Sequence, residues 1–466
     1  MDVKQKVIRK VFFPLWMMKS GNRGVLKYLH CYKFIDELSP DQILQRQFRR
    51  LRSILCHAYE ATPYYRDVFD SVGFLPYEFG EPAMLSKIPL LTKQTVRANL
   101  DKMIATNIKR ESLVKASTGG STGVPMSFFR DKECIYQRTG QELYFDDWMG
   151  YGVGEKMALF VAGSHFDGVG DRWKAIIRNA TCERMIRFDP YHITDQYMLE
   201  FAQRYGAFRP KVIKSFPNAL ATFAEFVGRN SIELPKVNAI ACTGENLYPQ
   251  QRQLFEKTFG GEVFERYGTK ECGVIASECR YHKGMHIFTE GVYVEVLDVD
   301  GRPVPPGEIG RIVVTDLFNR GVPLIRYEIG DMGVVSDRRS CDCGCPLPLL
   351  KEVLGRDRDV LYDSFGNPRP GYLFVEAINE LNLNAQFQIV QTDEKTLKVK
   401  VVKQRAGELD IDGLRRKYHA IMGDGIRIEM EFTEKIERDP SGKYRYVISE
   451  CDRNREVLVE TGDKFP

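Results

Sequence analysis

The 466-residue sequence lacks any apolar run of the roughly 18 residues that a membrane-spanning helix requires. It also lacks an excess of charge of one sign, because 67 Lys and Arg residues face 63 Asp and Glu residues. Such an even balance argues against nucleic acid as a partner. These absences predict a soluble, cytoplasmic protein without a transmembrane segment.

A secretory cleavage site is also lacking, although the N-terminus begins like a signal peptide. A basic segment precedes a short apolar run there, namely Lys4, Lys6, Arg9 and Lys10 before Val11–Met18. Pro14 interrupts the run and no small-residue cleavage motif follows it. We therefore favour a packed amphipathic first helix. The alternative is a peripheral membrane contact through Phe12, Phe13, Leu15 and Trp16.

The pattern of apolar residues divides the chain into three regions. Residues 1–100 are mostly helical, with apolar residues at helical spacing over Gln42–Ala61. From Val114 onward, short apolar runs alternate with helical stretches: Met157–Ala162, Val212–Ser215 and Asn238–Thr243. This alternation predicts an α/β fold with a mostly parallel sheet covered by helices.

The sequence after about residue 290 has first the pattern of short β-strands and then that of a small α+β unit. Short alternating runs mark a β-rich part at about 290–350: Tyr293–Leu297, Arg311–Thr315 and Leu324–Tyr327. Beyond Gly355 we predict a hairpin, a helix and a strand: Phe387–Gln391 with Leu397–Val402, Asp412–Met422, and Ile426–Phe432. The prediction is a large domain over 1–354 and a small C-terminal α+β domain over 355–466.

One loop has the composition of a phosphate-binding segment. It runs through Ser117, Thr118, Gly119, Gly120, Ser121, Thr122 and Gly123, and Pro125 closes it. Glycines let backbone N–H groups approach an anion closely, and the hydroxyls add further donors. It is not a Walker loop, because no G-K-[ST] sequence ends it. A flexible Ser/Gly linker is the alternative, and we favour phosphate binding.

Four further motifs follow in a fixed order. They are Arg266-Tyr267-Gly268-Thr269-Lys270-Glu271, Ile325–Asp331, Gly355-Arg356-Asp357-Arg358-Asp359, and Pro440-Ser441-Gly442-Lys443-Tyr444-Arg445. With the loop, this order and spacing resemble the core motifs of the acyl-adenylate-forming superfamily. Within it, the chain is most similar to phenylacetate–CoA ligases and CapK proteins, through His57–Arg66, Ser215–Leu220 and Thr243-Gly244-Glu245.

The resemblance implies an adenylate-forming fold with a mobile small domain, and it implies roles for individual residues. Tyr267 would border the adenine of ATP, Glu271 would hold Mg²⁺, and Asp331 would bind the ribose hydroxyls. Lys443 would supply charge at the α-phosphate. Further nucleotide contacts fall on Gly244, Glu245, Gly268, Thr269, Lys270 and Arg356. The acid would lie near Phe216, Asn218, Ala241 and Thr243.

Two positions depart from the pattern of the family. Lys270 stands where relatives have Thr or Ser, so its charge either replaces a hydroxyl contact or its side chain fills the site. Arg358 stands where many relatives have Asp at the hinge before the small domain.

Eleven cysteines without a signal peptide favour a reducing compartment, in which disulfides are not expected. Cys341, Cys343 and Cys345 lie close together, and Cys279, His282 and His286 precede them. Two nearby Cys with a distant Cys and His can form a tetrahedral zinc site. Reduced free thiols are the alternative. The family resemblance favours Cys279, Cys341 and Cys343, with His286 or His282 as the fourth ligand, and leaves Cys345 as a spare.

The resulting hypothesis is a two-step ligase. ATP and Mg²⁺ would activate a small carboxylic acid as its acyl-adenylate, and coenzyme A would then take the acyl group. One alternative delivers the acyl group to an amine or a sugar hydroxyl, as CapK suggests. Another is a non-catalytic nucleotide-binding relative. The resemblance is also compatible with a homodimer.

Overall fold

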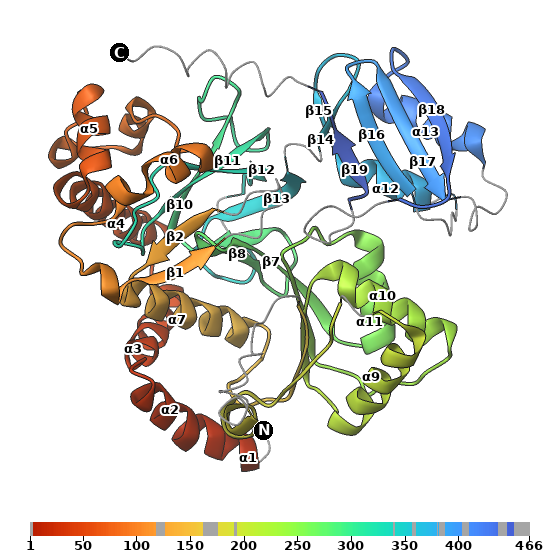
Figure 1. The fold of residues 1–466 in the computed structure, drawn as a ribbon, viewed down its shortest axis with the longest axis horizontal. Coiled ribbons are helices and arrows are strands. Elements are labelled where there is room, and N and C mark those ends of the chain that lie inside the picture. Colours follow the sequence, from red (N-terminus) through yellow and green to blue (C-terminus); the bar gives the residue numbers. More distant parts are fainter. Residues whose placement is uncertain are drawn as a thin grey trace.

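The computed structural model describes residues 3–117, 126–161, 176–190, 193–338, 341–356, 360–379, 381, 387–402, 410–436 and 445–451. Helices form its N-terminal part, as predicted: α1 (Val3–Val7), η1 (Ile8–Phe12), α2 (Phe13–Lys19), α3 (Gly24–Lys33), η2 (Ile35–Glu37), α4 (Pro40–Ala61), α5 (Pro63–Ser71), η3 (Pro76–Glu78), η4 (Pro82–Lys87), α6 (Lys93–Met103) and η5 (Arg110–Ser112). Figure 1 shows these helices along one side of the molecule.

The start of α4 illustrates how the sequence fixes a helix end. Ser39 accepts a hydrogen bond from the Gln42 backbone N–H, and the Gln42 side chain accepts one from the Ser39 N–H. Pro40 occupies the first helical position. A backbone N–H there would have no hydrogen-bond partner within the helix, so proline, which lacks one, costs nothing. The helix then places Leu51, Ile54 and Leu55 in the core.

A single 11-stranded sheet forms the centre of the molecule, in the order β10-β11-β12-β13-β9-β8-β7-β6-β5-β3-β4. Its strands are β3 (Met157–Phe160), β4 (Met185–Arg187), β5 (Val212–Ser215), β6 (Ala239–Thr243), β7 (Glu262–Thr269), β8 (Gly273–Glu278), β9 (Met285–Ile287), β10 (Val292–Leu297), β11 (Ile309–Asp316), β12 (Tyr327–Val335) and β13 (Leu349–Arg356). Strands β4, β3, β5, β6 and β7 are parallel. The others are antiparallel.

The predicted β-rich part belongs to the same sheet as the parallel strands, because a tight turn after β7 allows β8 to pair with it antiparallel. One predicted strand was wrong. Leu324–Tyr327 is not a strand, since β12 begins only at Tyr327. Arg326 just before it adopts φ of 49°, a left-handed conformation that no strand accommodates.

Helices cover both faces of the sheet. On one side α9 (Asp195–Phe208), α10 (Pro217–Arg229) and α11 (Pro249–Phe259) enclose an aromatic core with β3, β5 and β6. Over the antiparallel strands α4, α5 and α6 form a second core. On the other face α7 (Lys132–Trp148) contacts Arg266 of β7 through Asp146; it also lies near the short hairpin β1 (Val114–Ser117) and β2 (Ser127–Arg130). The short η6 (Asn179–Glu183) precedes β4.

The C-terminal part forms the predicted α+β unit with its own core. A four-stranded sheet runs in the order β18-β17-β16-β19 and is covered by two helices: β16 (Phe387–Asp393), β17 (Thr396–Val402), β18 (Arg427–Thr433), β19 (Val447–Ser449), α12 (Gly371–Asn379) and α13 (Ile411–Met422). β14 (Val360–Tyr362) and β15 (Pro368–Pro370) form a separate pair. The predicted boundary at 354/355 falls inside β13, and the division at that residue stays a prediction.

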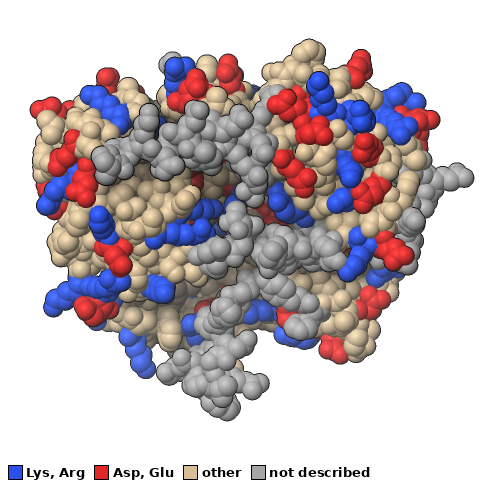
Figure 2. Space-filling view, turned by 45° about the horizontal axis from the view of Figure 1, so that its top comes forward, with Lys and Arg blue, Asp and Glu red and all other residues tan. Residues whose placement is uncertain are grey.

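No described helix is long and apolar enough to cross a membrane. Figure 2 shows Lys and Arg interspersed with Asp and Glu over the face drawn, as the even composition leads one to expect.

A buried carboxylate ties α7 to the parallel strands. Asp146 accepts from Lys214 Nζ of β5 and from Arg266 Nη1 of β7, each at 2.7 Å. The side chains of Asp146 and Arg266 are 4% and 7% exposed. These two cations hold the pKa of the Asp146 carboxyl below its usual value, in spite of its burial.

We expect Asp146→Ala to lower the free energy of unfolding by about 3–5 kcal/mol, because it leaves Arg266 buried without its charge partner. Urea denaturation followed by circular dichroism measures the change. The neighbouring Asp147→Ala is a matched control: Asp147 pairs with Lys33 at the surface, and its loss should cost at most about 1 kcal/mol. Equal losses for the two variants would contradict this account.

Candidate active site

The candidate site begins at the turn that links β7 to β8. Gly268 has no room for a side chain, since an added Cβ would lie 2.5 Å from the carbonyl oxygen of Gly273. Thr269 Oγ1 accepts a hydrogen bond from the Cys272 N–H at 3.0 Å. Gly273 has φ of 75°, which favours glycine. The motif glycine is therefore required by the turn itself.

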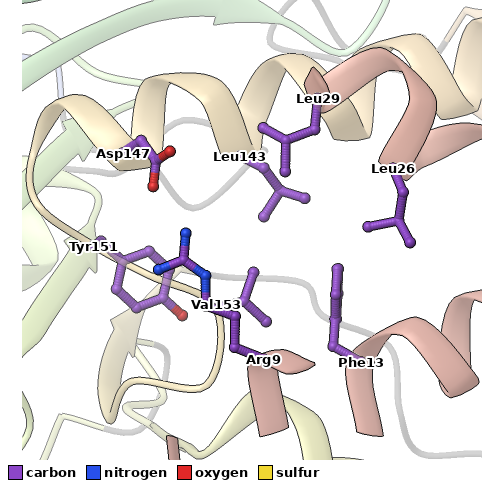
Figure 3. Close-up of a pocket in the computed structure, with 8 residues that line it drawn as sticks. All are labelled: Arg9, Phe13, Leu26, Leu29, Leu143, Asp147, Tyr151 and Val153. Atoms are coloured by element: carbon purple, nitrogen blue, oxygen red, sulfur yellow. The ribbon is translucent and has the colours of Figure 1, made fainter. Parts of the chain in front are cut away.

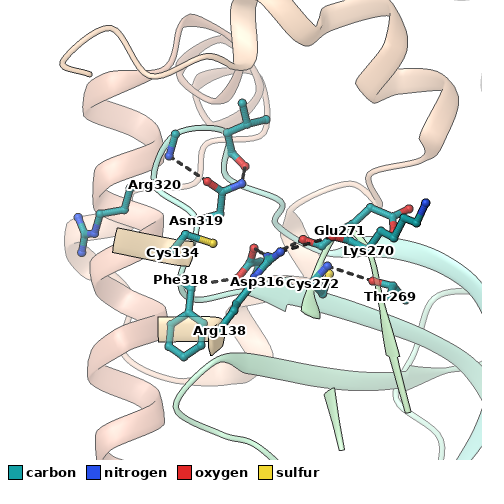
Figure 4. Close-up of polar contacts among 12 residues, drawn as sticks. Cys134, Arg138, Thr269, Lys270, Glu271, Cys272, Asp316, Phe318, Asn319 and Arg320 are labelled. Carbon is teal, nitrogen blue, oxygen red and sulfur yellow. Dashed lines mark hydrogen bonds and ion pairs between the residues drawn. The ribbon is translucent and has the colours of Figure 1, made fainter. Parts of the chain in front are cut away.

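Arg138 of α7 holds the main chain of this turn through hydrogen bonds to its carbonyl oxygens. Its guanidinium donates to the carbonyl oxygens of Glu271 at 2.5 Å and Lys270 at 3.5 Å, and pairs with Asp316 of β11 at 2.5 Å. Figure 4 shows this network, with the Lys270 side chain directed away from Arg138. The Lys270 side chain is exposed.

Glu271 and Asp331, the two acidic residues of the motifs, are each held by a tyrosine. The Tyr327 hydroxyl donates to Glu271 Oε1 at 3.0 Å, and the Tyr267 hydroxyl donates to Asp331 Oδ2 at 2.8 Å. Arg356 at the end of β13 adds a contact of 3.1 Å from its Nε to Asp331 Oδ1. Burial and the Asp331 charge raise the pKa of Tyr267, so its hydroxyl keeps the proton that it donates.

Lys93, a residue that the sequence analysis missed, lies close enough to these groups for their charges to act on its pKa. Burial and then Arg356 lower the pKa of its ammonium, while Glu271 and Asp331 raise it. Leu91 brings Lys93 there, because the Leu91 N–H donates to the Arg326 carbonyl and its own carbonyl accepts from the Glu328 N–H, both at 2.9 Å. Lys93 follows the N-cap residue Thr92 on a helix far away in the sequence, so no local signal marked it.

A second group of predicted residues lies at the carboxyl ends of β5 and β6. An added Cβ on Gly244, which has φ of 77°, would lie 2.7 Å from the Phe216 ring. Glu245 Oε2 accepts from the Asn218 N–H at 3.1 Å. Thr243 pairs in register with Arg266, which places this group beside Tyr267. Ala241 is buried under it. The carboxyl edge of parallel strands is the usual ligand-binding edge of such sheets.

Part of the predicted site lies outside the described residues. Thr118, Gly119, Gly120, Ser121, Thr122 and Gly123 of the phosphate loop lie there, as do Lys443 and Arg358. Ser117, the first loop residue, lies opposite Ser127 in the β1–β2 hairpin, so the two ends of the loop are neighbours. Met126, just after the loop, belongs to the same apolar core as Cys272 and Tyr327.

The cysteine and histidine segments form one cluster at the other end of β8. Ligand atoms of Cys279, His286, Cys341 and Cys343 all lie within 4.8 Å of one another. The sulfurs of Cys279 and Cys341 are 3.7 Å apart, and Cys343 Sγ lies 3.3 Å from His286 Nε2. Two sulfurs bound to one zinc in a tetrahedron lie about 3.8 Å apart, so this spacing fits the ion.

The surroundings of the cluster also fit a structural metal. His286 Nδ1 lies 3.2 Å from the Leu347 carbonyl oxygen, and donating to it leaves Nε2 as the ligand atom. His282 lies outside the cluster, because its ring nitrogens contact Glu278 at 3.2 Å and Glu262 at 3.0 Å. The Cys345 sulfur is not part of it either, although the Cys345 N–H donates to Cys343 Sγ. All eleven cysteines are free of disulfides.

Comparisons with known proteins agree with this site. A family described as AMP-binding enzyme matches residues 116–317, and the CapK C-terminal domain matches residues 371–450. Protein CapK of Staphylococcus aureus is 24% identical over 376 residues, 79% of this chain and 80% of that protein. The phenylacetate-coenzyme A ligase of Thermus thermophilus is 24% identical over 398 residues, 80% of this chain and 84% of that one.

The same fold is found among solved structures. 2-Hydroxyisobutyryl-CoA ligase in its postadenylation state has a TM-score of 0.70 at 18% identity, covering 89% of this chain and 90% of that one. Fold and motifs together define a member of the acyl-adenylate-forming superfamily. Within it, the chain is similar to CapK and to phenylacetate–CoA ligases over about four fifths of its length, and its C-terminal part matches the CapK C-terminal domain.

We expect the protein purified from zinc-containing medium to hold about one zinc per chain, as a closed four-ligand site requires. Cys341→Ser should abolish the bound zinc and lower the melting temperature. Elemental analysis and thermal unfolding measure the two effects. Cys345→Ser is the matched control, since its sulfur lies outside the cluster, and it should keep the zinc. Wild-type protein without zinc would contradict the assignment.

Proposed function

We propose that the protein is an AMP-forming acid–thiol ligase. A carboxylate oxygen of the substrate attacks the α-phosphorus of ATP, the bond to pyrophosphate breaks, and acyl-adenylate forms. The thiol of coenzyme A then attacks the acyl carbonyl, its proton is lost and AMP leaves. Transfer of this kind depends on positioning and charge stabilisation, for which the site supplies fixed donors and acceptors.

The main support for this proposal is that residues from three separate motifs contact one another in the structure. Tyr267 of β7, Asp331 of β12 and Arg356 of β13 are joined by two contacts of 2.8 and 3.1 Å. A carboxylate has about four acceptor positions, so Asp331 retains capacity for the ribose hydroxyls. Tyr267, held by Asp331, would border the adenine beside it.

Glu271 would hold Mg²⁺ together with the phosphates of ATP, because this hard cation prefers oxygen ligands and usually binds through one or two carboxylates. The bound cation would neutralise phosphate charge. Tyr327 keeps the carboxylate in place at 3.0 Å. Lys93, Lys270 and Lys443 would supply further positive charge, and the loop from Ser117 to Gly123 would donate its backbone N–H groups.

The acid would bind near Phe216, Asn218, Ala241 and Thr243, with Gly244 and Glu245 between it and the nucleotide. Lys214 and Arg266 lie next to this pocket, in register with Ala241 and Thr243. Both cations pair with Asp146 of α7. We place the protein in the cytoplasm, where ATP and coenzyme A occur together.

A second acceptor is favoured by one observation, the match of residues 371–450 to the CapK C-terminal domain. In this alternative the adenylate passes its acyl group to an amine or a sugar hydroxyl. Release of AMP from preformed adenylate separates the two: acceleration by coenzyme A supports the thiol, and acceleration only by amines or sugars supports the alternative.

We expect pyrophosphate exchange into ATP that depends on Mg²⁺ and on at least one carboxylic acid of a mixed panel. Glu271→Gln should lower the exchange rate more than about 100-fold, because it removes the charge that holds the cation. Tyr327→Phe leaves that charge but removes its hydrogen bond, and should cost about 10–100-fold. ADP and phosphate as products of the wild-type protein would show that the reaction class is wrong.

Lys443 should act in only one of the two half-reactions. The resemblance implies that the small domain rotates about Gly355–Asp359 after adenylation and carries Lys443 away. We expect Lys443→Ala to slow adenylation by roughly 10²–10³-fold and to leave the conversion of preformed adenylate near normal. Lys395→Ala removes an exposed charge from the same region and should change neither rate. Equal losses in both half-reactions would rule out this division of roles.

A further inference from the structure

The first helical segment of the chain exposes an apolar stripe. α1, η1 and α2 form one continuous run over Val3–Lys19. Val3, Val7, Val11 and Leu15 follow at intervals of four residues, a spacing that places them along one side of a helix. All four are exposed, from 41% for Val7 to 78% for Val3, and Phe12 and Met18 are exposed beside them.

The helical segment Val3–Lys19 is packed against the rest of the protein even though its apolar stripe is exposed. Its opposite side packs against the protein through Gln5, Ile8 and Met17, which are buried. Figure 3 shows Arg9 and Phe13 closing one side of a cavity of about 130 Å³ that is lined by residues from α3 and α7. Gly154 lies so close that an added Cβ would be 2.7 Å from Ile8. The helix is therefore fixed with apolar side chains on both sides.

The charges around the stripe have one sign. No Asp or Glu occurs between Val3 and Ile35, whereas the same segment carries eight exposed basic residues: Lys4, Lys6, Arg9, Lys10, Lys19, Arg23, Lys27 and Lys33. Lys33 pairs with Asp147 of α7. Elsewhere basic and acidic residues nearly balance, so the imbalance belongs to this segment.

Two more apolar residues lie next to the helical segment. Ile176 and Ile177 are 50% and 58% exposed and are separated from η6 only by Arg178. η6 packs against η1 and α2. An apolar stripe with Lys residues around it has the composition of a helix that lies in a membrane interface. The segment is too short and too charged to cross a bilayer.

We propose that Val3–Lys19 binds the protein to the surface of bilayers that contain anionic phospholipids. The apolar stripe would enter the headgroup region while the basic residues contact lipid phosphates. A second copy of the chain fits this surface poorly, because a two-fold contact brings the same basic residues together. In Figure 1, α1 and α2 lie at the edge of the molecule away from β14–β19, so docking leaves the C-terminal unit free.

Co-sedimentation of the full chain with vesicles tests this proposal. Binding to phosphatidylglycerol–phosphatidylcholine vesicles should exceed binding to pure phosphatidylcholine by at least about tenfold, and high salt should weaken it. Val7→Glu with Leu15→Glu should lower the binding at least about tenfold, since both the stripe and the charge are changed. Melting temperature and pyrophosphate exchange should not change, because both side chains are exposed and distant from the candidate site.

The double variant Val72→Glu with Val299→Glu is the matched control, as it places two carboxylates at exposed valines elsewhere, and it should bind vesicles like the wild type. Equal binding to both vesicle types, absent binding, or unchanged binding by the Val7/Leu15 variant would overturn the proposal. So would a wild-type dimer that the Val7/Leu15 variant converts to a monomer while the wild type binds no vesicles, because the stripe would then be a contact between copies.

Discussion

The ion pair between Arg138 and Asp316 determines where the acidic group of the candidate site can lie. Both side chains are buried, at 6% and 0% exposure, and a buried guanidinium is tolerated only where a charge partner and hydrogen-bond acceptors are both present. Arg138 meets this requirement by binding the carbonyl oxygens of Lys270 and Glu271 as well as Asp316. Helix α7, the turn after β7 and strand β11 must therefore meet in one arrangement, which orients Glu271 toward Tyr327.

Strand β8 connects this turn to the cysteine cluster. Glu271 precedes β8 and Cys279 follows it, and a strand of this length separates them by roughly 20 Å. The cluster is thus too far away to take part in chemistry at Glu271. It joins the end of β8 to β9 and to the loop before β13. Because β13 ends at Arg356, the cluster also supports the strand whose last residue contacts Asp331.

The candidate site has more positive charge than the family pattern predicts. Lys270 replaces a hydroxyl residue, yet its main chain is held by Arg138 and its side chain is exposed. Lys93 adds a second cation whose pKa the charges of Glu271 and Asp331 raise. Both lysines suit a polyanionic nucleotide, and they weigh against a relative that has lost nucleotide binding.

The sequence by itself determined the order of the motifs and the local elements. Periodicity placed α4, β5 and α13 within about two residues of their ends, and the C-x-C segment with a distant Cys and His indicated the cluster. These features depend on neighbours along the chain. Only the tertiary structure joined the parallel and antiparallel strands in one sheet, chose His286 over His282, brought Lys93 to Asp331 and turned Val7 and Leu15 outward. Each of these features depends on which strand or helix packs against which. Contacts between distant segments produce no periodic pattern of residues in a single sequence.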